Sequence, residues 1–393
     1  MRVFFCRGKI KDMPKDQSDV WWLEKRTELL EIAKHNLNAY VYNLDSVRAA
    51  AGKILSLSSV DRVLYAMKAN FNTDVLCTLE HSTIDFDCVS PGEVQHLIDV
   101  LPKLDKSRIL FTPNFAPREE YEWGIAQGIQ VTLDNLYPLQ AWPDLFDGQR
   151  LFVRVDPGEG QGHHEKVRTA GVQSKFGVSR SEIDELVRLT ENANATIVGI
   201  HAHSGSGILD TDNWRTIADE LVKVARRFPA VTVLDLGGGI GVPEKRGDAV
   251  FDLDALNERL LEFRGMNPKY EIWLEPGRYL VAEAGVLLTH LTQVKIKGEL
   301  QYVGVSTGLN SLIRPALYDA YHEIVNLTRI DDEASESVSV VGPICETGDR
   351  FGSDRLLPPS QENDVILIAN VGAYGQVMSS RYNLRDTPPE VII

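Results

Sequence analysis

Eight β-rich runs alternate with helix-length intervals between residues 62 and 277, and this alternation restricts the possible folds more than any other feature. Helical patterns such as PGEVQHLIDVL separate the runs. An alternation of this kind predicts a (β/α)8 barrel, with an open doubly wound sheet as the alternative. In order, the runs are RVLYAMK (62–68), IDFDCVS (84–90), RILFTPN (108–114), IQVTLDN (129–135), LFVRVDP (151–157), IVGIHAHSG (197–205), VTVLDLGGG (231–239) and YEIWLEPG (270–277).

The segments that flank the barrel have other patterns. Residues 19–35 carry apolar side chains at helical spacing, and the run from Ala39 to Tyr42 predicts a strand. From about residue 283, β-rich runs follow one another with short polar breaks, which is typical of an antiparallel β-sandwich or barrel. We therefore expect three units: 1–45, a helix and strand packing with the C-terminal domain; 46–282, the barrel; and 283–393, the β domain.

The composition excludes several kinds of partner. The 41 basic and 56 acidic residues give a net charge of −15, which repels phosphate backbones and anionic lipids. We expect no nucleic acid and no membrane as partner, and no run of residues is long and apolar enough to span a bilayer. The four cysteines lack a CxxC spacing, which favours reduced thiols and a cytoplasmic location.

Polar and titratable residues follow the predicted strands, at the end of a barrel where reacting groups are found. A barrel that served only as a scaffold would not need them. They are Lys68, Asp87, Ser90, Asn114, Asp134, Arg154, Asp156, His203, Ser206, Gly237 to Gly239, Glu275 and Arg278.

Lys68 closes an apolar strand, where a charged group is costly unless it is paired or its pKa is lowered. Such a lysine can form a Schiff base with a carbonyl substrate or with pyridoxal phosphate. The alternative is a lysine whose ammonium reaches solvent at the barrel rim.

Two loops predict a phosphate site. LDLGGGIGVP (234–243) follows the seventh strand and EPGR (275–278) follows the eighth, where bare backbone N–H groups can approach phosphate oxygens. A Rossmann fingerprint is excluded, because it needs glycine at Val242 and a helix at Pro243. The arginine of EPGR and Ser206 add phosphate donors.

HAHSGSG (201–207) has two interpretations. Its HxH spacing is found at zinc sites of metal-dependent barrel hydrolases, but the two later histidines lie beyond the barrel, so we expect no metal. The alternative is that His203 stacks on a cofactor ring while His201 faces the core. Glu275 would then meet a pyridine nitrogen and make the ring an electron sink for a carbanion.

With these residues in place, the chain from about residue 38 resembles the pyridoxal-phosphate-dependent diaminopimelate decarboxylases, in the superfamily of alanine racemase and ornithine decarboxylase. The resemblance rests on eight blocks in the order of the family. They are YAMKAN (65–70), SKFGV (174–178), HAHSGSG, LDLGGGIG, LEPGRYLV, LIRPALYDAYHEI (312–324), GPICETGD (342–349) and NVGAYGQVMSSRYN (370–383).

The resemblance implies decarboxylation of meso-2,6-diaminopimelate to L-lysine and CO2, through an external aldimine at the cofactor and a quinonoid. It implies a homodimer in which GPICETGD reaches the partner's active site, with Cys345 as proton donor. The cofactor residues that it implies are Lys68, Asp87, His203, Ser206, Gly238, Gly239, Glu275, Arg278 and Tyr374.

The substrate pocket can also be argued from side-chain chemistry. A guanidinium and a phenol suit a carboxylate, and LIRPALY supplies both as Arg314 and Tyr318. With Arg278 and Glu346, they fit a distal group that bears a carboxylate and an ammonium. Decarboxylases of ornithine or lysine need acidic partners there instead. In isolation Arg314 would be read as a surface ion pair, and its place in the family block decides for the pocket; the resemblance also implies Tyr374 as a substrate contact.

Several alternatives stay open. A related substrate (carboxynorspermidine, ornithine or lysine) fits the same cofactor chemistry, and alanine racemase chemistry would need a tyrosine base in place of Cys345. A non-enzymatic pyridoxal-phosphate carrier would be shorter and would lack the β domain. The first thirty-odd residues resemble nothing in the family, and one interpretation is a longer fused polypeptide, such as one with an aspartate kinase.

Overall fold

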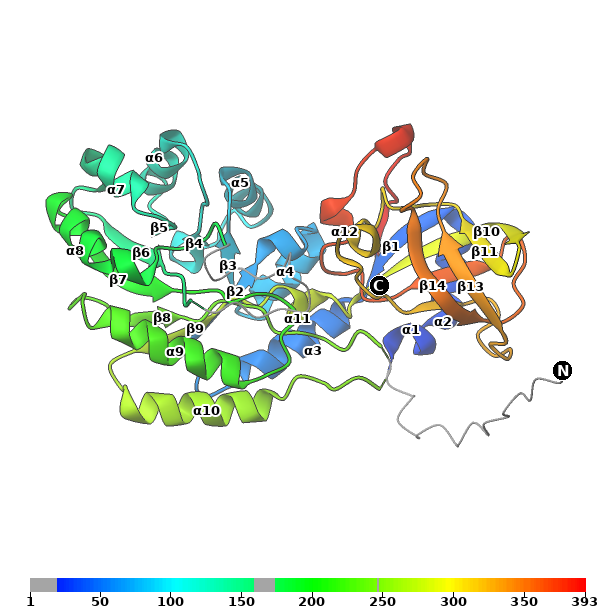
Figure 1. The fold of residues 1–393 in the computed structure, drawn as a ribbon, viewed down its shortest axis with the longest axis horizontal. Coiled ribbons are helices and arrows are strands. Elements are labelled where there is room, and N and C mark those ends of the chain that lie inside the picture. Colours follow the sequence, from blue (N-terminus) through cyan, green and yellow to red (C-terminus); the bar gives the residue numbers. More distant parts are fainter. Residues whose placement is uncertain (1–19, 159–173, 246) are drawn as a thin grey trace.

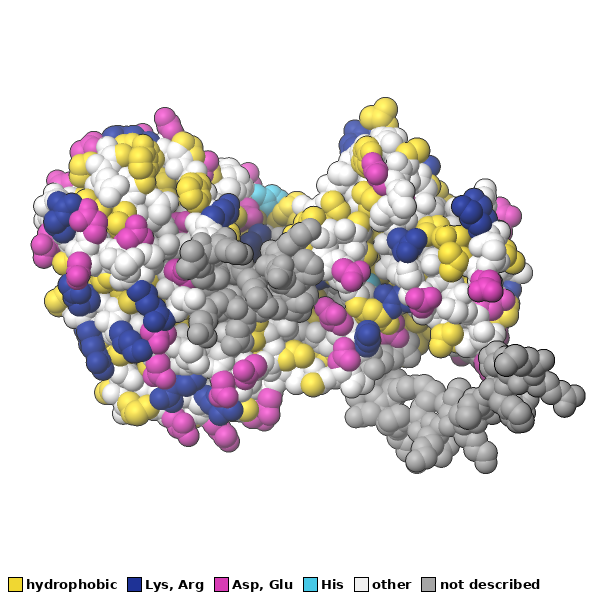
Figure 2. Space-filling model, viewed as in Figure 1, with side chains coloured by type: hydrophobic (Ala, Val, Ile, Leu, Met, Phe, Trp, Pro, Cys, Tyr) yellow, Lys and Arg dark blue, Asp and Glu magenta, His cyan; other side chains and the backbone are white. Residues whose placement is uncertain are grey.

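The computed structural model describes residues 20–158, 174–245 and 247–393, which form two lobes that lie side by side (Figure 1). The barrel is on the left of this view and a second sheet on the right. No helix among these residues is long and apolar enough to cross a membrane. Basic and acidic side chains lie interspersed over the face seen in Figure 2.

The first lobe is a closed barrel of eight parallel strands, which confirms the barrel rather than the open sheet. Each predicted run overlaps one strand, and Arg62 pairs with Trp273 to close the ring. The strands are β2 (Arg62–Ala66), β3 (Asp85–Cys88), β4 (Ile109–Phe111), β5 (Gln130–Leu133), β6 (Arg150–Arg154), β7 (Thr196–His201), β8 (Val233–Asp235) and β9 (Glu271–Leu274).

Helices surround the barrel because each has one apolar stripe. In α8, for example, Ile183, Leu186 and Leu189 recur at helical spacing and are buried. Local signals begin several helices, such as the side chain of Ser90, which accepts from Glu93 N at the start of α5. The helices are α3 (Leu44–Leu55), α4 (Thr73–His81), α5 (Pro91–Val100), α6 (Arg118–Ala126), α7 (Tyr137–Ala141), α8 (Ile183–Asn192), α9 (Asp212–Ala225), α10 (Leu253–Met266) and α11 (Arg278–Val281).

Side chains alternate between the two faces of each barrel strand. Val63 and Tyr65 of β2 join the core between strands and helices, whereas Leu64 joins a separate apolar cluster with Phe152 and Trp273. The rings of Phe152 and Trp273 stack with centroids 5.2 Å apart. This cluster fills the barrel interior, so that polar groups gather only at the strand ends.

The second lobe is an eight-stranded sheet to which the N-terminal strand contributes, as predicted: β1 pairs with β10. Most pairs are antiparallel, but β1–β16 and β11–β13 are parallel, because the chain returns to these strands through longer connections. The strands are β1 (Asn38–Tyr42), β10 (Gly285–Lys297), β11 (Leu300–Val305), β12 (Ile324–Asn326), β13 (Glu336–Val341), β14 (Arg350–Leu357), β15 (Val365–Ile368) and β16 (Glu390–Ile392).

The helix predicted over 19–35 is two helices. α1 (Trp21–Glu24) and α2 (Arg26–His35) meet at Lys25, whose ψ of 16° interrupts the helix. Trp22 and Leu29 are buried against one face of the sheet, beside Val286 of β10. Residue 19 lies outside the described residues.

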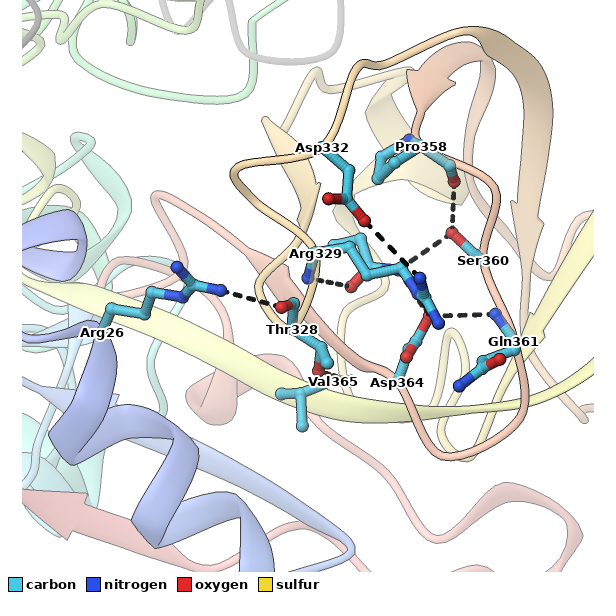
Figure 3. Close-up of polar contacts among 10 residues, drawn as sticks. Arg26, Thr328, Arg329, Asp332, Pro358, Ser360, Gln361, Asp364 and Val365 are labelled. Carbon is cyan, nitrogen blue, oxygen red and sulfur yellow. Dashed lines mark hydrogen bonds and ion pairs between the residues drawn. The ribbon is translucent and has the colours of Figure 1, made fainter.

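A polar network fixes this helix and the neighbouring turn to the sheet (Figure 3). Arg26 of α2 donates to the carbonyl oxygens of Leu327 (3.0 Å) and Thr328 (2.8 Å). Asp364 is only 3% exposed and accepts from Arg329 Nε at 2.8 Å. This ion pair offsets part of the cost of burying the Asp364 carboxylate.

Candidate active site

The C-terminal ends of the barrel strands surround a cavity of about 490 Å³. The structure brings most of the predicted site residues together there, because parallel strands of a closed barrel all end at one rim. Eleven of the residues singled out from the sequence line the cavity: Lys68, Asp87, Asn114, Arg154, His203, Ser206, Glu275, Arg278, Arg314, Tyr318 and Tyr374.

Lys68 lies in the short turn Met67–Ala69 after β2, and its side chain is 45% exposed toward the cavity. Its Nζ is 3.9 Å from Asp87 Oδ2. Burial opposes the ammonium, but the Asp87 carboxylate offsets this and raises the pKa of Lys68. Burial, together with the nearby Glu275 charge, raises the pKa of Asp87 to about 7. Lys68 is thus a cationic amine at the cavity wall, not a surface lysine.

Glu275 follows β9 and is buried next to a second acid. Its Oε2 is 3.0 Å from His201 Nε2. A ring nitrogen of His201 and one carboxylate oxygen each of Glu275 and Asp235 lie within 4.8 Å of one another. Burial alone would raise the pKa of Glu275, but the His201 charge lowers it, whereas burial raises the pKa of Asp235. Glu275 is therefore the ionised acid of this pair. Its Oε1 is buried and has no hydrogen-bond partner among the described residues.

The two histidines of HAHSGSG differ in role. His203 Nδ1 accepts from Gly238 N at 3.2 Å, and burial lowers the pKa of His203 well below its usual range. His203 is therefore a neutral ring with a fixed tautomer. His201 is buried as expected, but it contacts Glu275 and lines the cavity, so the expectation that it only faces the core was incomplete.

The predicted phosphate residues converge from both lobes. Arg278 donates from Nη2 to Ser206 Oγ at 3.0 Å, and its guanidinium carbon is 5.1 Å from the ring centroid of Tyr374. Gly239 has a φ of +96°, and a Cβ there would be 2.5 Å from the Gly205 oxygen. Only glycine fits at this close approach. The N–H of Gly238 is already donated to His203, so Gly238 acts on the histidine ring.

Arg314 and Tyr318 are the first and last residues of the short helix α12 (Arg314–Tyr318), which the second lobe contributes to the cavity. The Arg314 side chain is almost fully buried. Burial lowers its pKa to about 9, which still leaves the guanidinium protonated at neutral pH.

Cys345 and Glu346 do not line the cavity of their own chain. Both are exposed on the loop between β13 and β14. Buried Asp349 holds this loop, accepting from Ile344 N and Leu309 N, each at 2.6 Å. Cys345, Cys77 and Cys88 are free thiols, and Cys6 lies outside the described residues.

Arg154, Lys175 and Phe176 line the cavity but were not assigned a role from the sequence. Arg154 lies 3.9 Å from Asp134, and its guanidinium carbon is 4.3 Å from the ring centroid of Phe176. Lys175 is also at the cavity wall. In the sequence, the SKFGV block indicated Lys175 and Phe176, and the position of Arg154 at the end of a strand indicated that residue.

Comparison with known proteins identifies the family. Residues 44–282 match the family model of the pyridoxal binding domain of pyridoxal-dependent decarboxylases. A diaminopimelate decarboxylase of Methanothermobacter thermautotrophicus is 38% identical over 344 residues, which cover 84% of this chain and 80% of that protein. The diaminopimelate decarboxylase of Escherichia coli is 31% identical over 92% of this chain and 89% of its own length.

Comparison with solved structures leads to the same family as the sequence comparison. The crystal structure of diaminopimelate decarboxylase from Helicobacter pylori complexed with L-lysine matches with a TM-score of 0.85 at 29% identity, over 93% of each chain. The matched regions include both lobes, and the cavity contains the lysine, histidine, glutamate and arginine that the sequence blocks indicated. The chain belongs to the diaminopimelate decarboxylase family of pyridoxal-dependent decarboxylases, which are carbon–carbon lyases.

Proposed function

We propose that this protein decarboxylates meso-diaminopimelate to L-lysine and CO2 with pyridoxal 5′-phosphate bound in the barrel cavity. The observation that carries the proposal is the presence of Lys68, Glu275, Arg278 and Arg314 around one cavity of about 490 Å³. An amine, an ionised carboxylate and two guanidiniums are the groups that this cofactor and a dicarboxylic amino acid require. The names of the relatives support the same substrate.

The residues at the cavity wall fit the cofactor. Glu275 Oε1 is a buried acceptor without a partner among the described residues, as a protonated pyridine nitrogen would need. Lys68 would hold the aldehyde carbon, and Arg278, Ser206 and Tyr374 would hold the phosphate. When bound, the cofactor supplies an electron sink for the pair of electrons left by the departing carboxylate.

The ionisation of the site suits this chemistry. Glu275 is anionic because the His201 charge lowers its pKa, so it can keep a proton on a facing nitrogen. The neutral His203 ring adds no charge beside the cofactor, and its bond to Gly238 fixes its orientation. Asp87 Oδ2 pairs with the Lys68 ammonium at 3.9 Å. Lys68 would have to give up a proton before its Nζ could hold the aldehyde carbon.

The far end of the substrate would meet the second lobe. Arg314 and Tyr318 present a cation and a hydroxyl to the cavity, which suits the carboxylate that L-lysine retains. A distal ammonium alone, as in ornithine, would find a guanidinium there and would be repelled. This argument favours diaminopimelate over the related substrates.

The proton for the product would come from a second subunit. Cys345 and Glu346 are exposed, do not line their own cavity, and lie on a loop held by Asp349. In a head-to-tail homodimer this loop would enter the partner's cavity, where the Cys345 thiol gives a proton to the carbon that has lost CO2. Glu346 would bind the distal ammonium of the substrate.

Two further expectations from the sequence stay predictions. The division into residues 1–45, 46–282 and 283–393 is supported by the barrel closing before β10, which begins at Gly285. The cytoplasmic location rests on the cysteine content.

The decisive experiment measures CO2 release by the purified protein with pyridoxal phosphate. Meso-diaminopimelate, L-ornithine and L-lysine are compared, with Lys68→Ala as the blank and Lys175→Ala as a matched control for loss of a cavity lysine. We expect release from diaminopimelate alone. Release from ornithine or lysine instead would overturn the substrate, and no release together with no visible cofactor absorbance would overturn the cofactor chemistry.

A further inference from the structure

Arg314 has a partner that the reaction does not explain. Its Nη1 donates to His322 Nε2 at 3.1 Å, and both side chains are buried, with 4% and 0% of their surface exposed. His322 Nδ1 lies 2.8 Å from the carbonyl oxygen of Ala369. Because a carbonyl oxygen can only accept, the proton is on Nδ1 and Nε2 is the acceptor for Arg314.

This contact links the substrate pocket to the sheet. Arg314 begins α12, His322 lies between α12 and β12, and Ala369 directly follows β15. The imidazole is therefore held by a backbone carbonyl at the end of a sheet strand, and it in turn holds the Arg314 guanidinium. A free arginine side chain populates many rotamers, so such an anchor favours one orientation before any ligand arrives.

The anchor itself does not neutralise the positive charge of Arg314. In residues 20–158, 174–245 and 247–393, no carboxylate lies within 4.0 Å of Arg314; Glu244 lines the adjoining cavity, outside that distance. Burial, and then the Arg314 charge, lowers the pKa of His322 to about 3, so the imidazole is neutral. Of the charged groups around Arg314, the Arg278 cation lowers the pKa of Arg314, whereas the Glu244 carboxylate raises it.

We propose that His322 is a positioning residue that orients Arg314 toward the distal carboxylate of the substrate without neutralising it, and so sets specificity for a dicarboxylic amino acid. The inference rests on the proposed function. An Asp or Glu in the place of His322 would hold the guanidinium equally well, but it would cancel the charge that attracts an anion. A neutral acceptor such as His322 can orient the Arg314 guanidinium without cancelling its positive charge.

Three variants of the holoenzyme test the two hydrogen bonds of His322 separately. His322→Gln keeps an acceptor near the position of Nε2, His322→Asn keeps a donor near the position of Nδ1, and His322→Phe keeps the ring volume alone. The probes are L-lysine, which bears the distal carboxylate, and 1,5-diaminopentane, which lacks it. Binding is followed by the change in cofactor absorbance, and kcat and KM for meso-diaminopimelate are measured in parallel.

We expect His322→Phe and His322→Asn to weaken L-lysine binding by about tenfold or more, the effect of losing a hydrogen bond to a charged group. Binding of 1,5-diaminopentane should change by less than about twofold, and His322→Gln should restore most of the L-lysine affinity. The loss for meso-diaminopimelate should fall on KM more than on kcat. The unfolding midpoint and the cofactor absorbance of each variant report its folding.

The outcomes separate this inference from the proposed function. Equal losses for both probes, or His322→Asn binding L-lysine as the wild type does, would overturn the role of His322 while turnover of diaminopimelate upholds the function. If the wild type neither turns over diaminopimelate nor prefers L-lysine to 1,5-diaminopentane, the proposed function fails, and the inference fails with it.

Discussion

The Arg278 guanidinium lies against the ring of Tyr374, with 5.1 Å between its central carbon and the ring centroid. Arg278 starts α11, directly after the last barrel strand, whereas Tyr374 follows β15 of the second lobe. Tyr374 N also donates to the Ala69 oxygen, next to Lys68, at 2.9 Å. The proposed phosphate site is therefore shared by the two lobes, and neither lobe alone provides it.

This relationship predicts the effect of Tyr374→Phe. The variant keeps the ring on Arg278 but loses the hydroxyl that we assign to the phosphate, so we expect about tenfold weaker binding of pyridoxal phosphate. The measurement is titration of the cofactor into the cofactor-free protein. Tyr318→Phe, which removes the other tyrosine hydroxyl of the cavity, should leave cofactor affinity unchanged and raise KM for the substrate. Equal cofactor affinity in all three proteins would contradict the assignment.

The homodimer proposed above, with an active site shared between its subunits, predicts complementation. Lys68→Ala and Cys345→Ala should each be nearly inactive alone. When the two are mixed, dissociated and reassociated, half of the dimers are mixed, and each of these has one intact site, so about 25% of wild-type activity should return.

Complementation has its own control. Lys68→Ala mixed with Glu275→Gln places both defects at barrel cavities, so no site of a mixed dimer is intact and activity should stay absent. Failure of the first mixture to regain activity, when subunit exchange is demonstrated by differently tagged chains, would argue that Cys345 does not act across an interface.

Asp364 should contribute to stability and not to catalysis. In the wild type, Asp364 accepts hydrogen bonds of 2.8 to 2.9 Å from the Asn326 amide, the Gln361 N–H and the Arg329 guanidinium. Asp364→Ala leaves these three donors without that acceptor. Unsatisfied buried groups of this kind cost about 2 kcal/mol in the free energy of unfolding, measured by urea titration. Asp332→Ala, which removes the exposed partner of Arg329, should leave the midpoint unchanged. A similar loss in both variants would assign the stability to Arg329 and not to the buried carboxylate.

Asp134 predicts a pH dependence of stability. Burial raises its pKa from the usual 3.8 to about 6, although Arg154 opposes the shift. Between about pH 4 and pH 6, the Asp134 carboxyl is protonated in the folded state and ionised in the unfolded state. The contribution of Asp134 to the free energy of unfolding is therefore lost as pH rises from about 4 to 6.

The test compares Asp134→Asn, which cannot titrate, with the wild type. The variant should gain stability relative to the wild type as pH rises from 4 to 7, by up to about 3 kcal/mol for a shift of this size. Urea unfolding at several pH values measures the difference, and the exposed Asp147→Asn controls for the substitution. A difference that does not change with pH would mean that the Asp134 carboxyl titrates alike in the folded and unfolded chain.

The sequence by itself determined the barrel and most of the cavity wall. β-rich runs separated by helix-length intervals predict the strands, and a closed parallel barrel brings every strand end to one rim, so Lys68, His203 and Glu275 had to converge once the barrel was recognised. This part follows from local patterns and one topological rule.

Only the tertiary structure decided how distant segments meet. The parallel pairing of β11 with β13, the break at Lys25 and the contact of Tyr374 with Arg278 leave no local pattern. The same holds for the bond between His322 and Arg314, because a histidine in a loop is equally compatible with a surface or a core position. Strand order and side-chain partners depend on packing between residues that are far apart in the chain, and local propensity carries no information about that packing.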